Sequence, residues 1–185
     1  MNGPLMSARA LTRKDVGLIA DYWSLASVDY LRGMGVDPRK FPSRADFAAT
    51  LIEQLEKPLR DRSAYYTVWE SDGKPIGHSN VNKIVFGHEA YMHLHLWNPD
   101  ERHRGWGVPL VRRSLALFFE QLELRDVFCE PYDANPAPHR VLEKAGFEFV
   151  RSYVTVPGPI NFRQTVRRWH MRRASFEAMR ARSSS

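Results

Sequence analysis

A basic turn that contains two glycines is the part of this chain whose residue types most directly suggest chemistry. It consists of Arg102, His103, Arg104, Gly105, Trp106 and Gly107, and it lies between an extended apolar run and a segment with helical periodicity. Glycines permit a positive φ and a close approach of the backbone, so several amide N–H groups can converge on an anion at the start of the following helix. The turn therefore suggests a phosphate-binding loop. The alternative is a glycine-rich turn with solvated arginines, because short glycine motifs also arise by chance.

Two histidines lie in the strand-like segment that leads into this turn. Between Glu89 and Trp97 the residues alternate, so that Tyr91, His93, His95 and Trp97 share one face. An imidazole titrates near neutral pH, which makes both histidines candidates for a general base, with His95 first and His93 second. A hydrogen-bonded structural role is the alternative for either residue.

Further polar side chains follow the next short apolar strand. Glu130 and Asp133 could hold a cationic amine or orient a histidine, although Asp133 also fits turn chemistry because it stands just before a predicted helix start. Asn135 fits the N-cap of that helix. Cys129 precedes them in the strand, where a lone thiol is expected to be a small core residue.

The composition is typical of a water-soluble globular domain. The chain has 185 residues, 43% of them hydrophobic, a net charge of +6 and one cysteine. We expect one domain over residues 1–185, no metal site, and no membrane segment, because no apolar run approaches the roughly 20 residues of a membrane span. No secretory signal is recognised, so we expect a cytoplasmic protein. The basic charge favours polyanionic partners, but no nucleic-acid-binding motif accompanies it, so nucleic acid is not an expected partner.

Periodicity and turn residues predict an α/β chain of the α+β type. We expect a mixed, mostly antiparallel sheet of six to seven strands with helices on both faces. Turn-forming glycines and prolines in residues 29–42 predict a break, so that two helices precede the main sheet. The predicted strands are 5–11, 63–70, 75–85, 89–97, 127–131, 147–156 and 165–172; the predicted helices are 12–26, 43–55, 108–122 and 135–145, with a tail from about 174 that frays.

This order of elements and two linked motifs resemble the GCN5-related N-acetyltransferase (GNAT) superfamily. The loop signature of that family, Q/R-x-x-G-x-G/A, is matched by Arg102, Gly105 and Gly107. A downstream asparagine and an E-K-x-G-F ending are matched by Asn135 and by Glu143 to Phe147. The resemblance covers the second half of the chain closely and the first half by element order, and it implies a GNAT-like acyl-CoA N-acyltransferase fold.

The resemblance also implies roles for the residues around the basic turn. Acetyl-CoA would be the acyl donor, its pyrophosphate would be bound by the loop from Arg102 to Gly107, and Asn135 would contact the cofactor or its arm. The pantetheine arm would lie where the strand that ends near Trp97 separates from the strand at 127–131. A backbone N–H near Trp97 or Asn98 would stabilise the oxyanion of the tetrahedral intermediate.

Within the superfamily, His95, Glu130 and Asn135 look most like the siderophore-biosynthesis and aminoglycoside 6'-type branch. That branch tends to have an aspartate directly after Glu-Pro, where this chain has Tyr132, with Asp133 one residue later. The superfamily commonly places a tyrosine as thiolate acid at the position of Leu142. Tyr132, or water, would therefore have to supply that proton.

The predicted function is an acetyl-CoA-dependent N-acetyltransferase that transfers an acetyl group to a primary amine of a small molecule or protein, by direct attack in a ternary complex. The enzyme would act as a monomer or homodimer. The alternatives are a non-catalytic coenzyme A-binding sensor with a degenerate GNAT fold, and a basic RNA-associated protein. We expect residues 29–42 and 156–163 to form the acceptor pocket. Four aromatic residues could line the pocket or belong to the core: Tyr22, Trp23, Tyr30 and Phe41.

Overall fold

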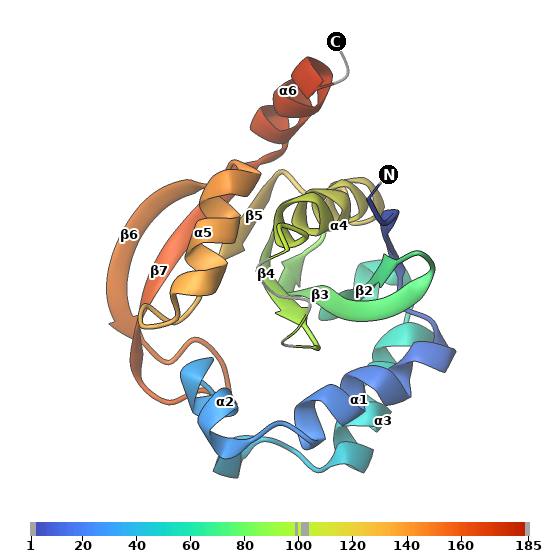
Figure 1. The fold of residues 1–185 in the computed structure, drawn as a ribbon, viewed down its shortest axis with the longest axis vertical. Helices are drawn as coiled ribbons and strands as arrows, with labels where there is room; N and C mark the ends of the chain where they lie inside the picture. Colours follow the sequence, from blue (N-terminus) through green and yellow to red (C-terminus); the bar gives the residue numbers. More distant parts are fainter. Residues whose placement is uncertain (1–2, 99, 101–103, 184–185) are drawn as a thin grey trace.

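The computed structural model describes residues 3–98, 100 and 104–183. These residues form a seven-stranded sheet in the order β1-β2-β3-β4-β5-β7-β6, in which only β4 and β5 run parallel (Figure 1). The mixed, mostly antiparallel sheet predicted from the sequence is therefore confirmed. The strands are β1 Met6–Ala10, β2 Ala64–Ser71, β3 Lys74–Val85, β4 Glu89–Leu96, β5 Asp126–Cys129, β6 Glu148–Thr155 and β7 Gln164–Arg172.

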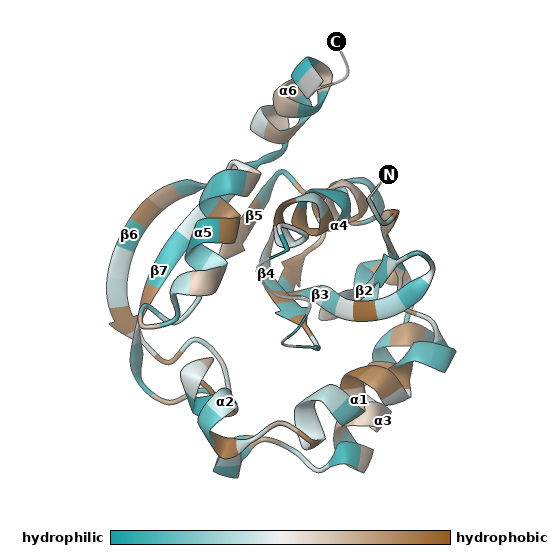
Figure 2. Ribbon diagram, viewed as in Figure 1, coloured by the Kyte–Doolittle hydropathy of each residue, from teal (hydrophilic) through white to brown (hydrophobic). Residues whose placement is uncertain are grey.

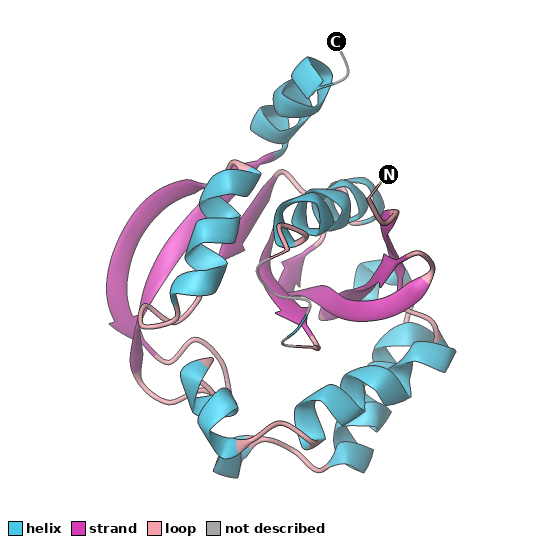
Figure 3. Cartoon of the chain, in the orientation of Figure 1, coloured by secondary structure: helices cyan, strands magenta, loops and turns pink. Residues whose placement is uncertain are grey.

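Helices cover both faces of this sheet, as Figure 3 shows. On one face, α4 and α5 pack over the strands together with α6, and on the other face lie α1, α2 and α3. None of the described helices is long and apolar enough to span a bilayer. The helices are α1 Val16–Ser24, α2 Val28–Gly33, α3 Arg44–Glu56, α4 Gly107–Gln121, α5 Pro136–Ala145 and α6 Arg173–Ser183, with short 3-10 turns at Arg13–Asp15, Pro38–Lys40 and Leu59–Asp61.

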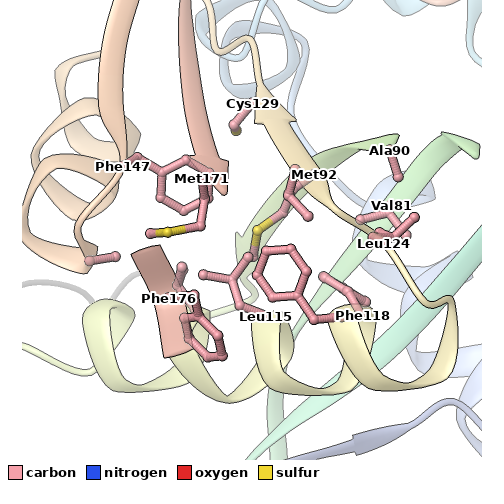
Figure 4. Packing of buried hydrophobic residues seen from close by; sticks show 14 of the residues in the cluster. Val81, Ala90, Met92, Leu115, Phe118, Leu124, Cys129, Phe147, Met171 and Phe176 are labelled. Carbon is pink, nitrogen blue, oxygen red and sulfur yellow. The ribbon is translucent and has the colours of Figure 1, made fainter. Parts of the chain in front are cut away.

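The larger core lies between the sheet and α4. Phe118 and Leu115 of α4 are fully buried against Met92 of β4 and Val81 of β3 (Figure 4). Hydrophobic and hydrophilic residues both occur along α4 (Figure 2), as expected for a helix that buries one face in the core and exposes the other. This packing fixes the axis of α4, and therefore the position of its N-terminus, relative to β4.

The sequence prediction was wrong about the segment after α1. Residues 29–42 were expected to form a break, but α2 occupies Val28–Gly33, so three helices precede β2. The side-chain oxygen of Ser27 caps α2 by accepting the Tyr30 N–H at 3.2 Å. The glycines that suggested a break come at the end of this helix rather than before it.

The segment after α2 is tied to the loop between β6 and β7. The Asp37 N–H donates to the Ile160 carbonyl at 2.9 Å, and the Gln164 amide donates to the Gly35 carbonyl at 2.7 Å. Gly35 has φ +80, and a Cβ at this position would lie 2.0 Å from the Gln164 Oε1. The two segments predicted to form the acceptor pocket are therefore neighbours, and a glycine is required where they meet.

Candidate active site

A cavity of about 640 Å³ lies beside the C-terminal half of β4. Its walls come from α2, the end of β4, the turn that starts α4 and one side of α5 along most of its length. In Figure 1 these elements surround the region between the labels β4, α5 and α2. Segments that are far apart in the sequence therefore meet at one site.

The cavity exists because β4 and β5 separate. Their parallel pairing ends at Tyr91 and Phe128, whereas β4 continues to Leu96 beside β3 alone. In an antiparallel strand, the N–H groups of successive residues point alternately to the two neighbouring strands. The Trp97 N–H points to β3, because it donates to the Ile76 carbonyl at 3.0 Å. The N–H groups of Leu94 and Leu96, which both line the cavity, therefore point to the side that β5 has left.

This alternation corrects one expectation about the oxyanion donor. The Trp97 N–H is bonded to β3, so it does not face the cavity. The indole of Trp97 donates to His78 Nδ1 at 2.7 Å, and Trp97 does not line the cavity. The Asn98 side chain accepts the Asp100 N–H at 2.9 Å, and Asn98 does not line the cavity.

One end of the cavity is formed by the N-terminus of α4. Gly105 has φ +81, which turns the chain into the helix, and Trp106 is the N-cap residue without a side-chain capping bond. Gly107 lies against α5, since a Cβ there would be 3.0 Å from a Val141 methyl group. Gly107 and Val108, the first two residues of α4, line the cavity, so the N-terminus of this helix lies at the cavity wall, a position that suits an anion.

The remaining residues of the predicted loop are placed only in part. Arg102 and His103 lie outside the described residues. Arg104 is exposed, donates from Nε to the Asp100 carbonyl at 3.0 Å, and lies over the Trp106 ring.

A second helix N-terminus faces the same cavity. Asn135 is the N-cap residue of α5, but its side chain makes no capping bond, and it lines the cavity beside Pro136. Arg140 and Lys144 of the same helix also line it and add positive charge. Lys144 belongs to the E-K-x-G-F motif, but neither residue was predicted from the sequence to contact the cofactor, although their i, i+4 spacing after Asn135 places both on one face of the helix.

His95 lines the cavity from β4, as predicted from its position in the strand. Its Nδ1 lies 3.2 Å from the Tyr22 hydroxyl of α1, and that hydroxyl lies 3.0 Å from the Tyr30 hydroxyl of α2. The imidazole also stacks on His78 of β3, with ring centroids 4.6 Å apart. The orientation of His95 is therefore fixed by two neighbouring elements, which the sequence did not reveal.

His78 supports this arrangement as a neutral side chain. It is fully buried, and its Nδ1 accepts the indole N–H of Trp97, so its proton resides on Nε2. Burial lowers the pKa of His78 to about 3. A neutral ring next to His95 does not oppose a positive charge on His95, as a second imidazolium would.

His93, the second candidate base, has a different environment. It does not line the cavity, and its Nε2 is buried without a hydrogen-bond partner among the described residues. Burial, together with the nearby Lys83, lowers its pKa to about 4. Such a group accepts a proton only weakly at neutral pH.

The predicted polar residues after β5 are engaged elsewhere and do not line the cavity. Glu130 accepts hydrogen bonds from Arg168 Nε at 2.6 Å and from the Tyr153 hydroxyl. Asp133 forms an ion pair with Arg167. The ring of Tyr132 packs edge-on against Phe162, so its hydroxyl is not placed at the cavity.

Comparison with known proteins decides the family. The sequence from residue 7 to residue 148 matches the model of the acetyltransferase (GNAT) domain. The chain belongs to the GNAT acetyltransferase family. A search of the curated proteins gave no match.

Solved structures share the GNAT fold of this chain. Spermidine N-acetyltransferase from Vibrio cholerae, in complex with CoA and spermine, is 20% identical with a TM-score of 0.75, over 93% of this chain and 98% of that chain. The aminoglycoside acetyltransferase AAC(6')-Ib, in complex with coenzyme A and kanamycin, is 19% identical with a TM-score of 0.72, over 95% and 99%. The ribosomal alpha-N-protein acetyltransferase RimL, in complex with coenzyme A, is 14% identical with a TM-score of 0.73, over 90% and 93%. The predicted GNAT-like fold is therefore confirmed.

Proposed function

We propose that this GNAT protein is an acetyl-CoA-dependent N-acetyltransferase that acts on a primary amine by direct transfer in a ternary complex. The observation that carries the proposal is that one cavity joins the N-termini of α4 and α5, the separated edge of β4 and His95. An anionic donor and a general base can therefore act on the same substrate.

The donor would lie along the separated edge of β4. The first N–H groups of α4 would bind its pyrophosphate, and Arg140 and Lys144 would add charge-assisted contacts to phosphate oxygens. The backbone N–H of Leu94 points to the separated edge of β4, where the thioester would lie. This N–H would stabilise the oxyanion of the tetrahedral intermediate. Acetyl-CoA supplies the activated acetyl group as a thioester.

His95 would act as the general base. With Nδ1–H donating to the Tyr22 hydroxyl, His95 carries a lone pair on Nε2 that can take the proton released as the amine attacks. Tyr22 is a positioning residue in this scheme, because it orients the imidazole from α1.

Tyr30 is the better candidate for the acid that protonates the departing thiolate. Its hydroxyl belongs to the same hydrogen-bonded group as His95, and it lines the cavity, unlike Tyr132. Leu142, at the position where the superfamily commonly has a tyrosine, is fully buried in the core. The likeness to the siderophore and aminoglycoside 6'-type branch stays a prediction; of the residues on which it rests, Glu130 is paired with Arg168.

The experiment that tests this proposal is the substitution His95→Gln, assayed with acetyl-CoA and a panel of primary amines. We expect kcat to fall by about 10²- to 10⁴-fold, the usual contribution of a general base, while calorimetry shows an acetyl-CoA Kd within about twofold of the unmodified protein. His88→Gln is the matched control, since the His88 side chain is 57% exposed and lies outside the cavity.

Three outcomes would count against the proposal. Unchanged turnover in His95→Gln would remove His95 from the mechanism. Binding of acetyl-CoA without turnover of any amine would favour the coenzyme A sensor. Absence of acetyl-CoA binding would contradict both readings.

A further inference from the structure

We propose that a second cleft beside the catalytic cavity binds the body of the acceptor, and that this body is apolar or aromatic and carries a single amine. The inference rests on the proposed acetyltransferase function and specifies its substrate class. It concerns the part of the molecule between α1, α2 and the end of β4, where Tyr22 and Tyr30 were expected from the sequence either to line the acceptor pocket or to belong to the core.

The cleft has a volume of about 480 Å³ and shares a wall residue with the catalytic cavity. Tyr30 lines both the cleft and the cavity, and Tyr22, in the wall of the cleft, is hydrogen-bonded to His95. An acceptor held in the cleft therefore has its amine end directed towards the proposed base. The lining residues are Leu18, Asp21, Tyr22, Leu25, Ala26, Ser27, Tyr30 and Trp97.

The aromatic walls of the cleft are held in place before any ligand binds. Trp97 is fixed by its bond to His78, and Tyr22 contacts Trp23 edge-on with ring centroids 5.3 Å apart. Tyr22 and Tyr30 also meet edge-on at 6.2 Å. Walls that are already ordered bind an apolar body at a smaller entropic cost.

The rim of the cleft is apolar and exposed to solvent. Leu25 is 81% exposed and Leu18 is 42% exposed, and Val28, 49% exposed, begins α2 next to them in the sequence. A ligand that covers this surface gains about 25 cal/mol for each Å² of apolar area removed from water. Exposed leucines at the mouth of a cleft favour an apolar ligand over a hydrated one.

The charges around the site do not suit a polycation. Asp21, the carboxylate of the cleft, is already paired with Arg44 Nε at 2.5 Å. Glu130 is paired with Arg168. Asp29 is exposed and lines the catalytic cavity, where its carboxylate can bind one ammonium group of an acceptor. Charge-assisted contacts to several ammonium groups need several unpaired carboxylates, so the charges of the described residues favour a monoamine.

The test compares KM values for amines that differ only in their bodies. We expect 2-phenylethylamine to have a KM at least tenfold lower than ethylamine, because its ring fills the cleft, and spermidine to show no lower KM than ethylamine. A tenfold change corresponds to about 1.4 kcal/mol, which burial of one ring exceeds. A spermidine KM below that of 2-phenylethylamine would overturn this inference while leaving the acetyltransferase function in place.

The substitution Leu25→Asp provides the second arm. It should raise the KM for 2-phenylethylamine about tenfold and leave the KM for ethylamine within twofold, because ethylamine does not reach the rim. Val85→Asp is the matched control: Val85 is 53% exposed, lies on β3 and lines neither the cavity nor the cleft. An unchanged 2-phenylethylamine KM in Leu25→Asp would contradict the cleft. Absence of transfer to every amine, with acetyl-CoA bound, would overturn the proposed function and this inference together.

Discussion

At the scale of single residues, the site depends on a pair of stacked imidazoles on adjacent strands. His78 and His95 are partners in the register of β3 and β4, but only His95 lines the cavity. The buried ring keeps its neutral form through burial and its bond to Trp97, and so provides a flat, uncharged surface for the reactive ring. His95, the proposed base, is therefore supported by a histidine that does not itself titrate near neutral pH.

This burial has a consequence for stability. In the unfolded chain, His78 binds a proton when the pH falls below its ordinary pKa of about 6.5. In the folded chain, His78 binds a proton only when the pH approaches 3. Between these values the unfolded state binds more protons, so the free energy of unfolding falls as the pH is lowered, by about 1.4 kcal/mol per pH unit for this group.

We therefore expect His78→Gln to weaken this pH dependence. Urea denaturation at pH 6.5 and pH 5.0 should show a loss of stability that is smaller by about 1.6 kcal/mol in His78→Gln than in the unmodified protein. The exposed histidine variant His88→Gln serves as control and should retain the full loss. Equal losses in His78→Gln and the unmodified protein would show that His78 is not the group responsible.

The sequence pointed to His95 in this hydrogen-bonded group but not to its partners Tyr22 and Tyr30. His95 could be identified because imidazole chemistry and strand alternation are local properties. Tyr22 is 73 residues away from His95, and nothing in the local pattern relates an α1 tyrosine to β4. Conversely, Glu130 and Asp133 carry suitable groups, but arginines from β7 bind them in the fold.

At the scale of elements, the donor end of the site requires α4 and α5 to pack closely at their N-terminal turns. Gly107 allows this approach, since a Cβ would lie 3.0 and 3.3 Å from the two methyl groups of Val141. Its backbone does not need a positive φ, so the requirement is one of space rather than of conformation. The second glycine of the loop is therefore a packing residue as well as part of the proposed anion site.

We expect Gly107→Ala to displace the N-terminus of α4 and to weaken acetyl-CoA binding about tenfold, through an overpacking cost of about 1–3 kcal/mol. The double variant Gly107→Ala with Val141→Ala should recover most of the affinity, because it restores the space. Calorimetric titration with acetyl-CoA measures both, with Val141→Ala alone as control. Equal losses in the single and double variants would argue against steric displacement as the cause.

The elements themselves were largely predictable. The β2–β3 hairpin was signalled by its turn, where Asp72 and Gly73 both have positive φ, and the end of α5 by Gly146 in the left-handed region. The missed helix, α2, has six residues, too few to show a periodicity, and Gly33 and Gly35 at its end suggested a turn. Short elements stabilised by tertiary contacts leave a weak signal in the sequence.

At the scale of the whole molecule, function depends on where the sheet opens. The paired edges of β4 and β5 separate after Tyr91 and Phe128, and the segment after α2 is bonded to the loop between β6 and β7 across the opening. The order of elements predicted the fold, but the cleft at Tyr30 and Trp97 depends on how α1 and α2 sit against the end of β4. That relation arises from tertiary packing, which periodicity does not encode.

The most direct test of the account is to incubate the purified protein with acetyl-CoA that carries a ¹³C-labelled acetyl group and a panel of aryl-alkyl, short-chain and polycationic amines, and to follow the products by mass spectrometry. We predict a labelled N-acetyl amine and one free coenzyme A for each acetyl group transferred, with the highest kcat/KM for an aryl-alkyl amine and a loss of transfer in His95→Gln. Binding of acetyl-CoA with no labelled amine in any reaction would contradict the account.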